Sequence, residues 1–139
     1  GKVQPQRDDE TLASILDIMP TIFSACGLDV PADLSGINLV DREAMQARKS
    51  IFVEGYTHDI ADLAHPEKSL VTQVVINGWD KLLIPGARQP DKEYTSAPAS
   101  IELFDLKADP LEKRNLVSER PEVVARLTQL QNAEWDAAK

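Results

Sequence analysis

The sequence predicts an α+β fold, in which a four-stranded antiparallel sheet packs against a C-terminal helix and a separate helix precedes the sheet. Four short segments carry strand-like apolar or alternating patterns, and an Asn-Gly pair between the second and third is a hairpin signal. Apolar residues at helical spacing close the chain. An antiparallel sheet needs one covered face, and we expect the C-terminal helix to cover it.

The first helix is predicted over about residues 17–26, where apolar residues recur at intervals of three and four. Pro20 is compatible with a helix only in its first turn, because proline lacks the N–H that later turns need. Asp17 is therefore predicted as the N-cap, with its carboxylate accepting from free backbone N–H groups, and Gly27 as the left-handed C-cap. We expect Cys26, among apolar neighbours, to be a buried and inert thiol.

A loop over residues 30–41 and a single turn over residues 42–49 lead to the strands. The strands are expected at Ile51–Tyr56, Leu70–Ile76, Trp79–Ile84 and Ile101–Leu106. Asn77-Gly78 predicts a type I′ turn, because both residue types tolerate positive φ. The alternation of the fourth strand predicts that it is buried mainly on one face.

Asp109-Pro110 ends the fourth strand, because proline cannot donate to a ladder. We expect Glu112, Arg114 and Asn115 to fix the following corner through local hydrogen bonds. A helix then begins at Pro121. Its apolar stripe consists of Val123, Val124, Leu127 and Leu130, with Trp135 near the end.

Composition excludes several classes of function. The 139 residues carry a formal net charge of −8, which argues against a nucleic-acid or anionic-membrane surface. The single cysteine excludes an intrachain disulfide and a cysteine-rich zinc site. No apolar run reaches the ~20 residues that a membrane span needs. The chain opens at Gly1 without a methionine, so we expect a processed or engineered start and a piece of something longer.

Two groups of residues carry a family resemblance. The stretch from Glu102 to Leu116 is similar to a signature near the C-terminus of sulfatases, and an upstream stretch is similar to a second segment of the same family. The matching residues are Glu102-Leu103-Phe104-Asp105-Leu106, Asp109-Pro110, Glu112, Asn115-Leu116, Asp17-Ile18-Met19-Pro20-Thr21, Gly27-Leu28, Pro31, Gly36 and Leu39. Their order and spacing make the resemblance to the sulfatases specific.

The resemblance implies a domain organisation. Sulfatases end in a small four-stranded antiparallel subdomain with a terminal helix, which would correspond to residues 50–139. Residues 1–49 would be the end of the large domain or a connecting segment, with the first helix at the seam. The large α/β catalytic domain, which resembles alkaline phosphatase, would precede Gly1. By resemblance alone, the compartment would be periplasmic, extracellular or lysosomal.

The chemistry of the family is missing from this chain. Sulfatases convert the cysteine or serine of C/S-x-P-x-R to formylglycine, whose hydrate is the nucleophile. Cys26 lacks both the proline and the arginine of this motif, and Ser96 has Pro98 in place but Ser100 instead of the arginine. No cluster of oxygen ligands suggests a metal site. We therefore expect no catalytic residue, metal or cofactor here, and formylglycine and calcium in the parent enzyme.

Three residues are candidates for substrate binding, namely Tyr56, His58 and Lys81. His58, in the cluster Tyr56-Thr57-His58-Asp59, could pair with an anionic group near a domain interface, although a solvated loop histidine is commoner. Lys81 could face a substrate cleft, although the exposed side of a hairpin often carries a lysine. We expect Trp79 and Trp135 to be packing residues.

Three functions remain open at this point. The first is the C-terminal domain of a sulfuric ester hydrolase, inactive by itself, whose partner is the missing catalytic domain. The second is a free-standing binding or oligomerisation module derived from a sulfatase tail. The third is the tail of a related phosphonate or phosphate ester hydrolase. An apolar seam around Ile15, Ile18, Ile22 and Phe23 would also permit a homo-oligomer.

Overall fold

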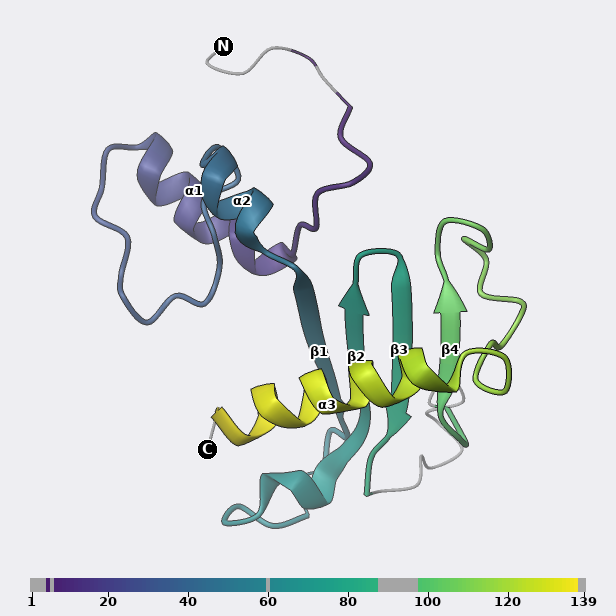
Figure 1. Cartoon of the computed structure of the whole chain (residues 1–139). Helices are drawn as coiled ribbons and strands as arrows, with labels where there is room; N and C mark the ends of the chain where they lie inside the picture. The colour runs from purple at the N-terminus through teal and green to yellow at the C-terminus, as the bar shows by residue number, and fades with distance from the viewer. Residues whose placement is uncertain (1–4, 6, 60, 88–97, 138–139) are drawn as a thin grey trace. The chain divides into compact units, whose positions relative to one another are not determined.

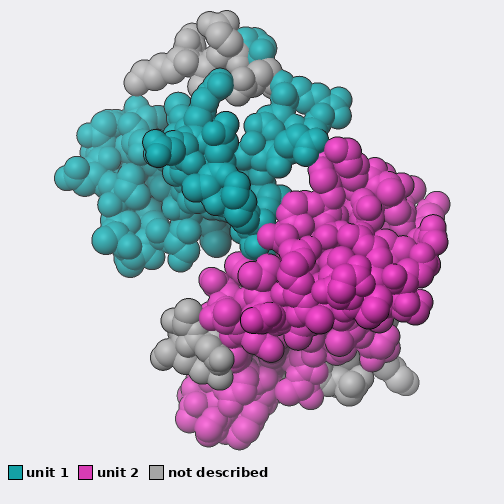
Figure 2. Space-filling view, viewed as in Figure 1, with its two compact units in different colours: residues 1–51 teal, residues 52–139 magenta. Residues whose placement is uncertain are grey.

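The computed structural model describes residues 5, 7–59, 61–87 and 98–137. The chain divides into two compact units, Gly1–Ile51 and Phe52–Lys139 (Figure 2). Figure 1 shows the helices and strands of each unit. That residues 1–49 end a larger domain stays a prediction.

The second unit contains most of the predicted sheet and the helix that covers it. The strands are β1 (Ser50–Tyr56), β2 (Leu70–Asn77), β3 (Asp80–Pro85) and β4 (Glu102–Asp105), in the spatial order β1-β2-β3-β4. The helix α3 (Pro121–Ala137) crosses one face of this sheet (Figure 1). The predicted four-stranded antiparallel sheet with its C-terminal helix is confirmed.

The β2–β3 hairpin turns one residue later than predicted. Asn77 pairs with Asp80, so the two loop residues are Gly78 and Trp79 rather than Asn77 and Gly78. Gly78 has φ +59°. Trp79 does not share this conformation, since Glu112 is the one described non-glycine residue with positive φ. A positive φ at the first loop position alone is the pattern of a type II′ turn rather than type I′. Trp79 consequently belongs to the turn and not to the third strand.

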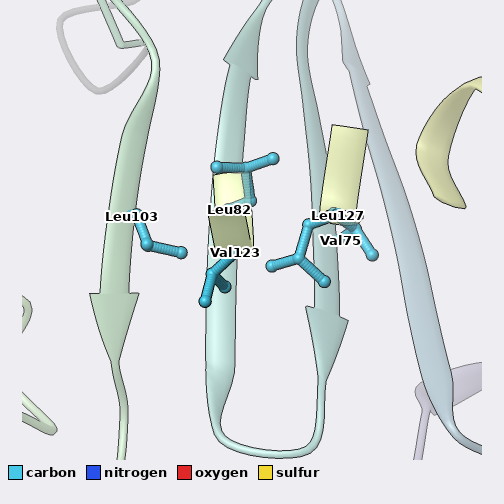
Figure 3. Packing of buried hydrophobic residues seen from close by; sticks show 5 residues of the cluster. All are labelled: Val75, Leu82, Leu103, Val123 and Leu127. Carbon is cyan, nitrogen blue, oxygen red and sulfur yellow. The ribbon is translucent and has the colours of Figure 1, made fainter. Parts of the chain in front are cut away.

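The core of this unit lies between α3 and the sheet. Val75 pairs with Leu82, and Leu82 pairs with Leu103, so three adjacent strands present one apolar row. Val123 and Leu127 of α3 pack onto this row, and Figure 3 shows the five side chains gathered over β2, β3 and β4. The alternation predicted for the fourth strand is confirmed, but Phe104 on the opposite face is also buried. The prediction of burial mainly on one face was therefore wrong.

Polar contacts set the position of α3 along the sheet. Arg120 contacts Asp80 at 2.9 Å, and Arg126 contacts Asp80 at 3.1 Å. Arg126 also donates to the side-chain oxygen of Asn77 at 2.6 Å. These contacts are partly exposed and therefore add little free energy, but they fix the first half of α3 over the hairpin.

The corner after β4 combines local and distant contacts. Asn115 Oδ1 accepts from the N–H groups of Val117 at 3.1 Å and Leu103 at 3.2 Å, and Leu116 N–H donates to Leu103 O at 2.8 Å. The local role predicted for Asn115 is therefore only half of its function. Glu112 does bond locally, since its N–H donates to Asp109 O at 3.1 Å, but its carboxylate also binds the ammonium of the distant Lys81 at 2.7 and 2.8 Å.

The first unit contains η1 (Ile15–Asp17), α1 (Ile18–Ala25) and α2 (Arg42–Ala47). Gly27 has φ +71°, as a left-handed residue beyond the end of α1 should. Cys26 is exposed, so the predicted buried thiol was wrong. The helix ends there, and its apolar neighbours do not enclose the sulfur.

Asp17 is the N-cap residue of α1, as predicted, but its side chain does not make the predicted bond to that helix. Its carboxylate makes no cap bond to α1 but accepts from Ser14 N–H at 2.7 Å, in a capping box with η1, and from Ile37 N–H at 2.8 Å. The guanidinium of Arg48 binds both carboxylate oxygens, at 2.6 and 2.7 Å. Asp17 is fully buried, and the hydrogen bond from Arg48 above all lowers its pKa from 3.8 to about 2. The residue thus joins η1, the 36–37 loop and the end of α2.

Buried Gln131 yields a prediction about stability. It lies one helical turn beyond Leu127, is fully buried, and neither of its amide atoms has a hydrogen-bond partner among the described residues. An unsatisfied buried amide costs about 1–3 kcal/mol. We expect Gln131→Met to raise the free energy of unfolding by about 1–2 kcal/mol in urea titrations. Gln129→Met, on the exposed side of the same helix, is the control, and equal effects of the two substitutions would contradict the prediction.

Asp17 yields a prediction about pH. Its pKa is lower in the folded chain (about 2) than the ordinary 3.8, so its stabilisation is complete above about pH 4 and is lost as the pH falls towards 2. Asp17→Asn leaves Arg48 without its charge partner and should cost about 3 kcal/mol at neutral pH. Amide exchange of Ile37, measured by NMR, should become much faster. Asp29→Asn, at an exposed site, is the control and should leave that exchange unchanged. Slow exchange of Ile37 in Asp17→Asn would contradict the role of Asp17 as the acceptor for this amide.

Candidate functional site

The loop between β1 and β2 contains His58, one of the three predicted substrate-binding residues, and it directly follows a second, Tyr56. Thr57 N–H donates to Ser69 O at 2.9 Å, so the two ends of the loop meet. A compact loop of this length with joined ends is an Ω-loop, a structure that often carries function. Its last residues form the short helix η2 (Pro66–Ser69), where a wholly irregular connection was expected.

Two buried hydroxyl groups hold the base of the loop. Ser69 Oγ accepts from Ala61 N–H at 2.9 Å, and Thr57 Oγ1 donates to Asp59 O at 2.8 Å. Thr57 and Ser69 are 7% and 4% exposed, so these bonds are protected from competition with water. The loop is therefore preformed rather than shaped only by a ligand.

Ion pairs close the outer half of the loop. Lys68 Nζ lies 2.7 Å from Asp62 Oδ2, and the pKa of Asp62 is lowered chiefly by this hydrogen bond. His65 Nδ1 lies 3.0 Å from Glu67 Oε1. Leu63 projects from the loop and is 86% exposed. The loop thus presents an apolar side chain beside paired charges.

Tyr56 lies at the end of β1, directly before the loop. Its hydroxyl donates to Glu54 Oε2 at 2.7 Å, and its pKa is raised to about 12, first by burial and then by Glu54. The phenol consequently stays protonated at neutral pH and acts as a hydrogen-bond donor rather than a base. His58 is exposed two residues further along, at the start of the loop.

The structure separates Lys81 from the other two candidates. Thr57, next to both Tyr56 and His58, bonds to the residue before β2, whereas Lys81 is paired with Ile76 near the far end of that strand. Six residue steps along β2, from its first residue Leu70 to Ile76, correspond to ~20 Å. Lys81 is also occupied by Glu112. Tyr56 and His58 thus form one candidate site that Lys81 does not complete, and the binding role of all three stays a prediction.

No group of three or more His, Cys, Asp or Glu residues in the described part of the chain could hold a metal ion. Ser96 lies outside the described residues. Of the helices that the structure describes, none is both long and apolar enough to cross a membrane. The loop offers hydrogen-bond donors, acceptors and a histidine, which suit recognition of a polar ligand.

Sequence analysis missed Ser69 and Glu54. A serine between Lys68 and an apolar strand carries no signal of burial, because its partner Ala61 is eight residues away. Glu54 could have been found from its spacing, because residues i and i+2 of a strand lie on the same face. Glu54 and Tyr56 are such a pair. The packing role predicted for Trp79 is modified, because Lys107 lies 5.3 Å above its ring.

Comparison with known proteins identifies the family that this fold resembles. No family model and no curated protein matches the chain. A Bacteroides thetaiotaomicron protein designated 4S-sulf, from a core genetic locus for the metabolism of multiple glycosaminoglycans, aligns with a TM-score of 0.63 at 27% identity. The alignment covers 91% of this chain. The chain matches the C-terminal portion of a sulfatase. The predicted resemblance is confirmed.

Two further structures share the fold at lower identity. One, in complex with its substrate D-glucosamine-2-N,6-O-disulfate, gives a TM-score of 0.57 at 22% identity over 86% of this chain. A phosphonate monoester hydrolase of Agrobacterium radiobacter gives 0.52 at 22% identity over 88%. This sulfatase-like chain spans only 23%, 24% and 27% of the lengths of the three structures.

The base of the loop can be tested directly. Ser69→Ala leaves Ala61 N–H without its acceptor, and we expect a local cost of about 1–3 kcal/mol. Hydrogen exchange at Ala61 should accelerate while exchange in α3 stays unchanged. Ser118→Ala, at an exposed position, should change neither, and a slow Ala61 amide in Ser69→Ala would show that the loop is held by other contacts.

Proposed function

We propose that this chain is the C-terminal domain of a sulfuric ester hydrolase of the sulfatase family and is inactive by itself. The observation that carries the proposal is the alignment at 27% identity over 91% of the chain, which includes both units. Calcium and formylglycine would then reside in the catalytic domain, and the enzyme would work in a periplasmic, extracellular or lysosomal compartment.

The proposed partner is the catalytic domain, and the first unit offers a surface for it. Ile15, Ile18, Met19 and Ile22 are 80%, 49%, 50% and 51% exposed. Exposed apolar residues clustered on one helical segment mark an interaction surface. Phe23, which was expected to be exposed with them, is half-buried. The structures that the chain matches are about four times longer, which supplies a partner large enough to cover this surface.

Within that enzyme, the Ω-loop would contribute to the rim of the substrate cleft. His58, exposed at the start of a preformed loop, would bind an anionic or hydroxyl group of the substrate, and Tyr56 would support it. Lys81 would act separately, because its ammonium first has to leave Glu112.

The longer reading frame provides the test of the proposed function. We expect a C/S-x-P-x-R motif upstream of Gly1 and hydrolysis of 4-nitrophenyl sulfate by the longer protein. Residues 1–139 alone should not hydrolyse it. A longer protein with the motif but without sulfate ester hydrolysis, or a frame that encodes no such motif, would refute the proposal.

A histidine substitution tests the role of the loop in the same longer protein. His58→Ala removes a hydrogen bond to a charged or polar group, and we expect KM to rise by about 10-fold to 100-fold with a smaller change in kcat. His65→Ala is the matched control, since His65 lies in the same loop, seven residues further along, beside Glu67. Equal KM values for wild type and His58→Ala would remove His58 from the site.

A second candidate function is hydrolysis of phosphonate or phosphate esters. The likeness to the phosphonate monoester hydrolase favours it, although that likeness shows the fold alone. Phenyl phosphonate monoesters assayed beside the sulfate ester discriminate the two functions. A higher kcat/KM for the phosphonate would support the second function.

A further inference from the structure

The two edges of the sheet differ in how they are protected. β4 forms one edge, and its Leu103 has both backbone groups engaged, N–H with Asn115 and C=O with Leu116. The chain after the corner therefore closes that edge with its own atoms. β1 forms the other edge and is the longer strand, with seven residues against four.

The backbone of β1 presents a row of outward groups. Thr57 N–H points towards the β2 side, where it donates to Ser69 O. Backbone groups alternate along a strand, so Val53 and Gly55 also point towards β2, and Phe52, Glu54 and Tyr56 point outward. In the part of the chain that the structure describes, no backbone hydrogen bond outside the sheet reaches these three residues.

Side chains do not protect this edge either. The sequence of β1, SIFVEGY, contains neither lysine nor proline, and Glu54 is its one charged residue. Val53 is 50% exposed. A long strand with apolar residues and free outward groups is a template for pairing with another strand.

We propose that a second copy of this chain pairs with β1, strand to strand and antiparallel, about a twofold axis at Val53. In this register Val53 lies opposite Val53 of the second copy, and Phe52 lies opposite Glu54. Phe52 and Glu54 exchange two N–H···O bonds, and the symmetry repeats them. No like charges stand opposite each other, whereas a register centred on Glu54 would oppose two carboxylates. The strand can therefore pair with a second copy of itself without opposing like charges, as a twofold contact requires, and its one charge excludes the register centred on Glu54.

A disulfide tests the register in the full chain. The Cα atoms of opposed residues in a non-hydrogen-bonded pair lie about 4.5 Å apart, within the range that a disulfide spans. Val53→Cys, made with Cys26→Ser because Cys26 is exposed, should form a covalent dimer under mild oxidation. Leu63→Cys in the same background is the control, since Leu63 is more exposed but lies outside the proposed contact. Equal crosslinking of the two variants would overturn the proposal.

Light scattering over a concentration series tests the hydrogen bonds. Glu54→Pro removes an outward N–H without removing a bond to β2, and the dimer dissociation constant should rise at least about tenfold, because twofold symmetry removes two bonds. Glu54→Ala is the matched control, because it loses the Tyr56 contact but keeps the N–H. A monomer at all concentrations would overturn the proposal. A dimer that is lost in Ile18→Asp but retained in Glu54→Pro would also overturn the proposal, because that result assigns the contact to α1.

Discussion

Leu103 is the residue on which the second unit depends. Its side chain is fully buried between the sheet and α3, and its register partner Leu82 is fully buried as well. Its backbone N–H and C=O bind Asn115 and Leu116, which turn the chain towards α3. One residue therefore fixes the apolar core, the strand pairing and the approach of the helix. Burial and hydrogen bonding act together here, because the free-energy cost of leaving either backbone group unpaired is larger in an apolar site.

In the first unit, too, single residues of the sulfatase-like motifs hold several segments of the chain together. Asp17 and Thr21 bind the backbone of the loop that contains Ile37 and Leu39, at 2.8 Å in each case. A Cβ atom at Gly36 would meet Leu16 O at 2.0 Å, so only glycine permits this close approach. These three motif residues therefore hold the loop against the first helical segment, and their contacts explain why these residue types are needed there.

The candidate site depends on the same kind of support. Tyr56 and His58 occupy fixed positions because Thr57, between them, is buried and bonded across the base of the Ω-loop. A histidine on a preformed loop loses little conformational entropy when it binds a ligand. The separation of Lys81 follows from the antiparallel register, which puts the start of β2 and the β2–β3 turn at opposite ends of the sheet.

The sequence by itself determined the strands, the covering helix and the family resemblance, because period-two and helical patterns, glycine and proline are local signals. Leu82, Leu103 and Leu127 could be assigned to the core on those signals alone. The tertiary structure decided the partners of Asp17, Glu112 and Ser69, since Arg48, Lys81 and Ala61 are distant along the chain. It also moved the hairpin turn to Gly78-Trp79, because the pairing of whole strands outweighs the preference of one dipeptide. Long-range pairing leaves no periodic trace in a sequence, and only the folded chain shows it.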